Sequence, residues 1–282
     1  MLIGGAVALS LIVAVVSCLT SGAFLGLAWL WVLPVSFLGS FLSLGVLAFL
    51  FLWLMAAIVD MEKPQEEDSK LYRTIVNLYA PAIMTVLQAQ LHLQGMEKLP
   101  KEGRFLLVCN HINDMDPVTL IRVFPNSQLA FISKRENDQR FIVGPVLHKI
   151  LGQPINREND REALKTILNC IRLLKEDKAS IAVFPEGYTS MDGLLRHFRS
   201  GVFKIAQKAK VPIVVCTVKN TNKLFKNAPK LKTTDVHVHL LDVLQPEDFA
   251  GMTTVELGEK VYRMMADDLG PDLVLDTAGK EE

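Results

Sequence analysis

The sequence predicts an α/β domain, with a mostly parallel or mixed sheet flanked by helices, preceded by an N-terminal transmembrane helical hairpin. Two observations predict this combination. Residues 1–59 of the 282 contain no Asp, Glu, Lys or Arg, and every charged side chain lies from Asp60 onward. Beyond that point, short apolar runs alternate with helical patterns, which is typical of a mostly parallel sheet covered by helices.

The composition excludes several classes of function. The 30 basic and 30 acidic side chains cancel, whereas a nucleic-acid-binding protein carries a basic excess. The four cysteines show no CxxC spacing, so we expect small buried residues in a reducing compartment and no metal site. The sequence has no Walker loop or dinucleotide-type glycine pattern, so no nucleotide cofactor is expected.

Residues 1–59 are predicted to form the transmembrane hairpin. About 20 apolar residues cross a bilayer core, so we expect spans at 3–25 and 36–58 with a tight turn near 31–34. A single long span is the alternative. A signal peptide is disfavoured, because there is no basic n-region and the apolar stretch is too long.

The charges that follow the second span predict its orientation. Lys63, Lys70 and Arg73 lie just beyond it, while the N-terminal flank and the turn carry no Lys or Arg. By the positive-inside rule, we expect an integral protein of the cell membrane with its body on the cytoplasmic face.

The remainder is expected to comprise a charged linker at 60–70, a main domain at 71–275 and a flexible tail at 276–282. The main domain should begin with amphipathic helices over 71–94, kinked or split at Pro81, that lie against the bilayer surface.

Strands and helices are then predicted in alternation. Apolar runs predict strands at 104–109, 128–132, 153–156, 180–184, 212–218 and 235–243. Apolar periodicity predicts helices at 160–176, 200–209 and 254–269. Thr253 and Glu256 have capping-box spacing at the start of the last helix.

Sites in such sheets lie at the carboxyl ends of strands, which draws attention to the segment NHINDMDP at 110–117. His111 could be a general base oriented by a carboxylate, or a loop residue. Spacing alone does not choose between Asp114 and Asp116 as its partner. Asp116 is also a good N-cap for the helix that begins at Pro117, and one carboxylate could serve both purposes.

Three further segments follow or form strands. Arg157 lies just after a strand and suits a phosphate, although a surface ion pair is the simpler interpretation. Phe184-Pro185-Glu186-Gly187-Tyr188-Thr189-Ser190 combines a flexible turn with hydroxyl donors. The run 211–215 is apolar and is best explained as a core strand.

In this order, the four segments resemble the 1-acylglycerol-3-phosphate acyltransferase family of membrane glycerolipid acyltransferases. The family's first motif is His, four residues and Asp, matched by His111 and Asp116. An arginine after a short strand (Arg157), an FPEG turn (184–187) and a VPI strand (211–213) follow. The resemblance covers roughly residues 70–245, includes Lys134 in the segment 133–136 after the second strand, and implies the glycerolipid acyltransferase fold.

The resemblance implies transfer of an acyl group from coenzyme A or acyl carrier protein to the hydroxyl of 1-acylglycerol-3-phosphate (lysophosphatidic acid) at the lipid bilayer. It implies that His111 is the base and Asp116 its partner, which leaves Asp114 as a solvent-facing loop acid. The expected substrate-binding residues are Arg157, Glu186, Gly187, Thr189, Ser190, Lys134 and Arg199. Neither metal nor cofactor is expected, and Cys109 as an acyl-enzyme nucleophile is disfavoured.

The sequence departs from the family pattern at one position. The third motif usually carries an arginine where this chain has Thr189, so one phosphate-binding charge is missing. Arg196, Arg199 or Lys204 could replace it. The alternatives are a different lysophospholipid acceptor, a thioester hydrolase that uses the same His–Asp pair with water, or a lipid-binding protein with no activity.

Overall fold

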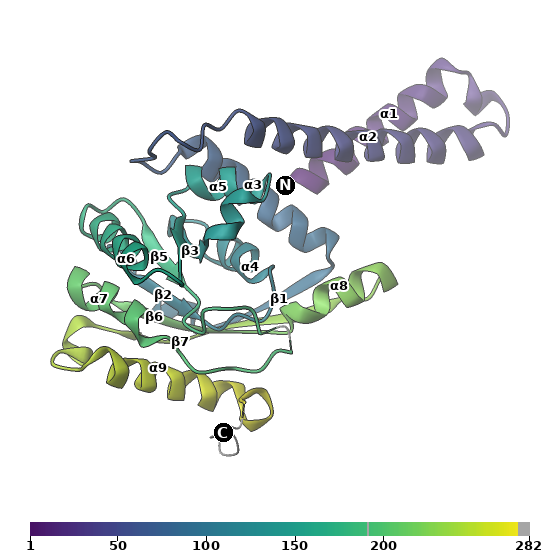
Figure 1. Cartoon of the computed structure of the whole chain (residues 1–282). Coiled ribbons are helices and arrows are strands. Elements are labelled where there is room, and N and C mark those ends of the chain that lie inside the picture. Colours follow the sequence, from purple (N-terminus) through teal and green to yellow (C-terminus); the bar gives the residue numbers. More distant parts are fainter. Residues whose placement is uncertain (191, 276–282) are drawn as a thin grey trace. The chain divides into compact units, whose positions relative to one another are not determined.

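The computed structural model describes residues 1–190 and 192–275, and the chain divides into two compact units, Met1–Glu62 and Lys63–Glu282 (Figure 1). The predicted flexible tail at 276–282 lies outside the described residues.

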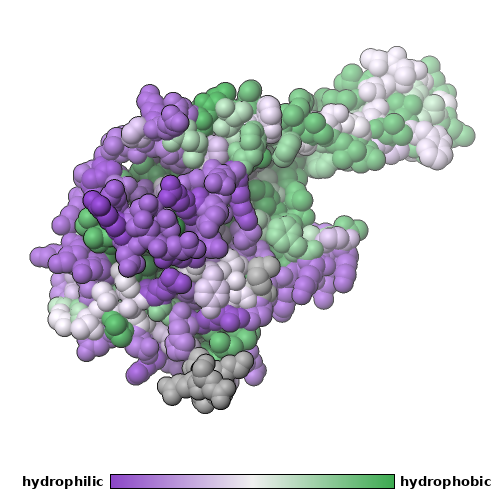
Figure 2. Space-filling model, in the orientation of Figure 1, coloured by the Kyte–Doolittle hydropathy of each residue, from purple (hydrophilic) through white to green (hydrophobic). Residues whose placement is uncertain are grey.

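The first unit contains two helices long and apolar enough to span a membrane, α1 (Leu2–Thr20) and α2 (Trp29–Ala57). Their mean hydropathies are 2.6 and 2.3, and Figure 2 shows hydrophobic side chains over their surface. The two helices pack against each other. All three tryptophans of the sequence lie on α2, at positions 29, 31 and 53.

The turn between these helices is not where the sequence suggested. We expected it near 31–34, but Pro34 lies inside α2 and the chain reverses over 21–28. Gly22, with a φ of 65°, enters a short 3-10 helix at Ala23–Leu25, and Gly26 ends it. The glycines make this reversal, whereas Pro34 lies in the second turn of α2 and removes one backbone hydrogen bond of that helix.

The second unit is a sheet covered by helices on both faces (Figure 1). Its described strands are β1 (Ala89–Gln94), β2 (Leu106–Cys109), β3 (Leu129–Lys134), β4 (Gln153–Ile155), β5 (Ser180–Val183), β6 (Ile213–Lys219) and β7 (Thr234–Leu244). Its described α-helices are α3 (Lys70–Val86), α4 (Asp116–Val123), α5 (Val143–Lys149), α6 (Asp160–Lys175), α7 (Lys204–Ala209), α8 (Leu224–Asn227) and α9 (Thr254–Leu269). The strand order is β1-β7-β6-β2-β5-β3-β4, and β6 pairs with β7 antiparallel while the other neighbours pair parallel. The predicted mixed α/β architecture is confirmed.

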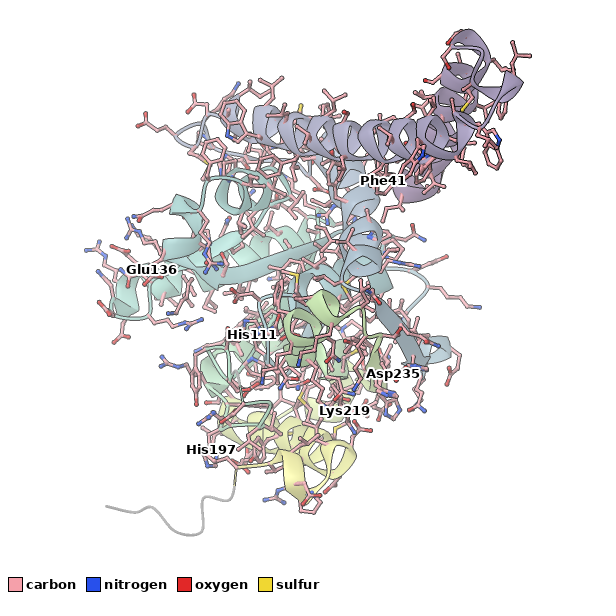
Figure 3. All side chains as sticks on the ribbon, turned by 90° about the vertical axis from the view of Figure 1, so that its right-hand side faces the viewer. Phe41, His111, Glu136, His197, Lys219 and Asp235 are labelled. Carbon is pink, nitrogen blue, oxygen red and sulfur yellow. The ribbon has the colours of Figure 1, made fainter. Side chains whose placement is uncertain are left out.

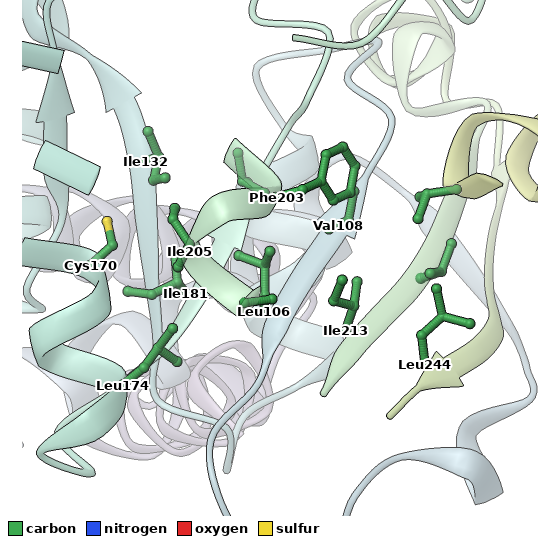
Figure 4. Packing of buried hydrophobic residues seen from close by; sticks show 14 of the residues in the cluster. Leu106, Val108, Ile132, Cys170, Leu174, Ile181, Phe203, Ile205, Ile213 and Leu244 are labelled. Atoms are coloured by element: carbon green, nitrogen blue, oxygen red, sulfur yellow. The ribbon is translucent and has the colours of Figure 1, made fainter. Parts of the chain in front are cut away.

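The core has two layers because successive side chains of a strand point to opposite faces. Leu106 and Val108 of β2 face α6, α7 and α9, in the layer drawn in Figure 4. Leu107 and Cys109 face α3, α4 and α8. All four side chains are completely buried, so β2 is a central strand from which the loop at 110–115 emerges.

The expectation of helices throughout 71–94 is wrong for residues 87–94. A single helix, α3, continues through Pro81 to Val86. Gln88 then has a φ of 53°, which breaks the helix, and residues 89–94 form β1 beside β7. The alternation of Leu91 and Leu93 with polar residues suits a strand at the edge of a sheet.

Candidate active site

Three loops converge at one edge of the sheet because β6, β2 and β5 are neighbouring parallel strands. The loop after β2 carries His111, the loop after β5 carries Glu186 and Thr189, and the loop after β6 carries Thr221. His111 is labelled in Figure 3, where its side chain lies within the body of this unit.

His111 and Asp116 form a hydrogen-bonded dyad. Nδ1 of His111 lies 2.9 Å from Oδ2 of Asp116. Asp116 is completely buried, whereas the His111 side chain is 16% exposed. An ionised carboxylate only accepts hydrogen bonds, so Nδ1 carries the proton and Nε2 presents a lone pair. The ring also stacks on Phe184, with centroids 4.1 Å apart. This geometry suits a general base that accepts a proton at Nε2.

Asp116 holds the histidine loop in shape, but it is not the N-cap that we predicted. Helix α4 already includes Asp116, and its N-cap position is Met115. Oδ2 of Asp116 accepts from the upstream backbone N–H groups of Ile112 (2.7 Å) and Asn113 (2.8 Å), and Oδ1 accepts from the hydroxyl of Thr221. Among the described residues, every donor to this carboxylate lies outside α4, because the side chain turns back over its own loop.

Thr189 occupies the free side of the dyad. Its Oγ1 lies 3.0 Å from Nε2 of His111. Because Nε2 is the unprotonated nitrogen, the hydroxyl of Thr189 donates this hydrogen bond. The backbone N–H of the next residue, Ser190, donates to the carbonyl of His111 at 2.8 Å.

Glu186 links the loop after β2 to the loop after β5 through backbone hydrogen bonds. Its side chain is buried, Oε1 accepts from the backbone N–H of His111 at 2.7 Å, and Oε2 accepts from that of Arg196 at 3.1 Å. Burial raises the pKa of Glu186 to about 7 against the opposing effect of these two N–H groups, and the charge of Asp116 adds to the rise. Glu186 therefore binds two loop N–H groups, although it was expected among the substrate-binding residues.

Two arginines lie beside this turn. Burial lowers the pKa of Arg157, which follows β4, and the nearby charge of Arg199 lowers it further while Glu136 opposes the change. Gly187 has a φ of +83°, and a Cβ there would lie 2.9 Å from Cδ and Nε of Arg199. Across residues 1–190 and 192–275, neither guanidinium forms an ion pair or a side-chain hydrogen bond. Two like charges close enough to repel each other, with Glu136 nearby but not in an ion pair with either among the described residues, favour an anionic ligand.

Other predicted residues are placed less centrally. Lys134 is exposed at the end of β3, and in the described part of the chain its side chain makes no ion pair with the residues above. Ser190 is buried, and its hydroxyl has no hydrogen-bond partner among the described residues. Asp114 is an exposed loop acid, as expected, and lies 3.4 Å from Arg140.

The sequence interpretation missed Thr221, which binds the carboxylate of the dyad. A usable pattern was present, because Asn220-Thr221 follows β6 directly at the same edge of the sheet.

Cys109 is completely buried, and burial raises the pKa of its thiol well above the ordinary value, so it is not a thiolate nucleophile at neutral pH. No cluster of three or more His, Cys, Asp or Glu suited to a metal occurs among the residues that the structure describes.

A mostly parallel sheet with a histidine–carboxylate dyad at its strand ends is the arrangement of an α/β enzyme, and comparison with known proteins specifies the class. Residues 90–219 match the family model described as Acyltransferase. The 1-acyl-sn-glycerol-3-phosphate acyltransferase of Borreliella burgdorferi is 31% identical over 159 residues, 55% of this chain and 63% of that protein. The enzyme of the same name from Saccharomyces cerevisiae is 30% identical over 181 residues, 62% of this chain and 58% of that protein.

A solved structure shares the fold. The crystal structure of the 1-acyl-sn-glycerophosphate (LPA) acyltransferase PlsC from Thermotoga maritima superposes with a TM-score of 0.59 at 22% identity, over 78% of this chain and 86% of that one. Over residues 90–219 this chain is thus similar to the acyltransferase family. It spans less than two thirds of the length of the curated relatives that it matches first.

Proposed function

We propose that this protein transfers a fatty acyl group from an acyl thioester to the free hydroxyl of 1-acylglycerol-3-phosphate, and so makes phosphatidic acid. The observation that carries the proposal is a histidine hydrogen-bonded to a buried carboxylate, together with two neighbouring arginines that form no ion pair among the described residues. The names of the relatives support the choice of acceptor.

In the proposed mechanism, Nε2 of His111 removes the proton of the acceptor hydroxyl as its oxygen attacks the thioester carbonyl. The new C–O bond forms, the C–S bond breaks, and the imidazolium returns its proton to the thiolate. Asp116 stabilises the transient positive charge on His111 through the 2.9 Å hydrogen bond to Nδ1. The thioester is already activated, so the reaction requires no protein nucleophile, metal or cofactor.

Arg157 and Arg199 are proposed to bind the phosphate of the acceptor. Arginine forms bidentate hydrogen bonds with phosphate oxygens, and two phosphate charges would offset the repulsion between the guanidiniums. Glu186 would shape this site indirectly, through the backbone groups of His111 and Arg196 that it holds. By binding the phosphate, Arg199 would supply the positive charge that is missing at Thr189.

The acceptor and product are membrane lipids, which fits the apolar helices α1 and α2. We propose that both helices cross the bilayer and that the body lies on the cytoplasmic side, because Lys63, Lys70 and Arg73 follow α2. A cytoplasmic body would also meet coenzyme A or acyl carrier protein, the two candidate carriers of the acyl group.

The proposal is tested by assaying the full chain in liposomes with acyl-CoA and with acyl carrier protein donors against a panel of lysolipids. We expect acylated product from 1-acylglycerol-3-phosphate with at least one donor, and none from His111→Ala. Wild-type turnover by His111→Ala would contradict the mechanism, and a preference for another lysolipid would reassign the acceptor.

The phosphate site is tested separately with Arg157→Ala. In this mechanism Arg157 contacts the acceptor and does not contact the acyl donor. Its removal should therefore raise the KM for 1-acylglycerol-3-phosphate about tenfold or more, and raise the donor KM much less. Equal effects on both constants would remove the assigned role.

A further inference from the structure

The side chain of Thr189 holds the position on the catalytic base that the proposed mechanism gives to the acceptor. Its hydroxyl donates to Nε2 of His111 at 3.0 Å, while Nδ1 is bound to Asp116 at 2.9 Å. An acceptor hydroxyl about to lose its proton must make the same bond, to the same lone pair, at about the same distance. The bond from Thr189 therefore has to break, or shift, before the reaction proceeds.

We propose that Thr189 is a specificity-determining residue that keeps water from His111 until an acceptor hydroxyl displaces it. The inference rests on the proposed function, since it assumes that a thioester is bound beside the base. Without an acceptor, the threonine hydroxyl satisfies Nε2, and the acyl group is not lost to solvent.

Water is a real competitor at this position. The His111 side chain is 16% exposed, so solvent reaches the ring. With a thioester bound, Nε2 could remove a proton from water while the water oxygen forms a bond to the carbonyl carbon. The C–S bond would break, the thiolate would take the proton, and the products would be a fatty acid and a free thiol. This hydrolysis uses the same steps as transfer and needs no further reactant.

The local structure lets the hydroxyl move while its backbone stays in place. The backbone beyond Thr189 is fixed by the bond from Ser190 N–H to His111 O at 2.8 Å, and the turn before it by the bond from Gly187 N–H to Phe184 O at 3.1 Å. Rotation of one side-chain torsion moves Oγ1 from one staggered position to another and releases Nε2. Thr189 is half-buried, so its hydroxyl can find water when it turns away.

The same position distinguishes this chain from the family pattern. An arginine there would add a charge for the phosphate, but a guanidinium carries donors on a long side chain and would not give the base a compact neutral partner. Compared with an arginine at this position, Thr189 lacks a positive charge, which Arg157 and Arg199 can supply. In return it places a hydroxyl at the base.

The test measures thiol release from acyl-CoA by the full chain in liposomes, with and without 1-acylglycerol-3-phosphate. Thr189→Ala opens Nε2 to water, and we expect acceptor-independent thiol release to rise about fivefold or more, the equivalent of one net hydrogen bond of about 1 kcal/mol. Thr189→Ser retains the hydroxyl and should restore low hydrolysis. Thr233→Ala removes the hydroxyl of an exposed loop threonine that is not one of the site residues, and this control should match wild type.

Two results would overturn the inference. One is unchanged acceptor-independent thiol release in Thr189→Ala. The other is an acyl adduct on Thr189 of the wild-type protein, detected by mass spectrometry after exposure to acyl-CoA alone, which would make the residue a nucleophile. Failure of the proposed function looks different, since the wild type would then acylate no lysolipid while the effect of Thr189→Ala on hydrolysis could still be measured.

Discussion

At the scale of single residues, Asp116 has more influence than its place in a two-residue dyad suggests. Its two oxygens accept from one imidazole, two backbone N–H groups and one hydroxyl. The side chain therefore sets both the tautomer of His111 and the path of the loop that carries it.

Replacing this carboxylate should disable the base. In Asp116→Asn, the amide NH₂ would face N–H or O–H groups that now donate to a carboxylate oxygen. The carboxylate would then no longer hold the proton of His111 on Nδ1. We expect kcat to fall about 10³- to 10⁴-fold, measured with the liposome assay.

The matched control is Asp114→Asn in the same loop. Asp114 is exposed and lies 3.4 Å from Arg140, and such surface pairs contribute about 0–1 kcal/mol. A mild effect of the control with a severe effect of Asp116→Asn supports the pairing, and the reverse order would assign His111 to the wrong acid.

Glu186 predicts a pH dependence of stability. Burial raises its pKa to about 7, above the ordinary value of 4.5, so the folded state holds this proton more tightly than the unfolded chain does. The stability that Glu186 contributes is therefore fully present below about pH 4.5 and declines as the pH rises to about 7. Thermal unfolding of wild type and Glu186→Gln should be measured from about pH 5 to about pH 8. As the pH rises, the wild type should lose stability relative to the variant. A pH-independent difference would contradict the assigned cause.

At the scale of secondary-structure elements, one arginine fastens α3 to the sheet. Arg73 donates to both oxygens of Asp68, at 2.9 and 3.1 Å, and to the carbonyl of Leu129 at the start of β3. It also donates to the carbonyl of Ile150, just after α5. Both charged side chains are about nine-tenths buried or more.

Removing this arginine should destabilise the body strongly. Arg73→Met leaves the Asp68 carboxylate buried without its partner, which typically costs about 3–5 kcal/mol. Arg135→Ala is the control, because Arg135 pairs with Glu162 on an exposed surface and should contribute about 1 kcal/mol at most. Calorimetric unfolding in detergent would measure both, and equal effects would contradict the structural role.

The elements also show how far the sequence alone could reach. Central strands such as β2 and β6 and the helix α9 with its capping box are local patterns, and they appear as predicted. Strand β1 was missed for two reasons. A short edge strand that follows a helix has little periodicity of its own, and its pairing partner β7 is distant in the sequence, since Ala89 pairs with Thr234, 145 residues later.

The candidate site divides in the same way. His111 and Glu186 could be named because they follow strands, and parallel strands bring their carboxyl ends together. The choice of Asp116 over Asp114 required the resemblance to the family. The bond from Thr189 to Nε2 and the bond from Thr221 to Asp116 could not be predicted. They depend on the exact paths of two loops, which spacing along the chain does not determine.

At the scale of the whole molecule, the proposed orientation can be tested by labelling. If both α1 and α2 cross the bilayer with the body inside, the turn at 21–28 faces outward. A membrane-impermeant maleimide should then label Ser21→Cys in intact cells, and Glu97→Cys in the body only after permeabilisation. All four native cysteines are buried, which lowers the background. Labelling of Glu97→Cys in intact cells would reverse the orientation.

The placement of the three tryptophans on α2 has a practical consequence. Residues 63–282 contain no tryptophan, so the tryptophan fluorescence of the full chain originates in the hairpin. Quenching by brominated acyl chains would measure the depth of α2 in a bilayer without any mutation or dye. Substrate binding near His111 has no tryptophan to report it, and a tryptophan introduced into the body of a variant that lacks those on α2 would supply one.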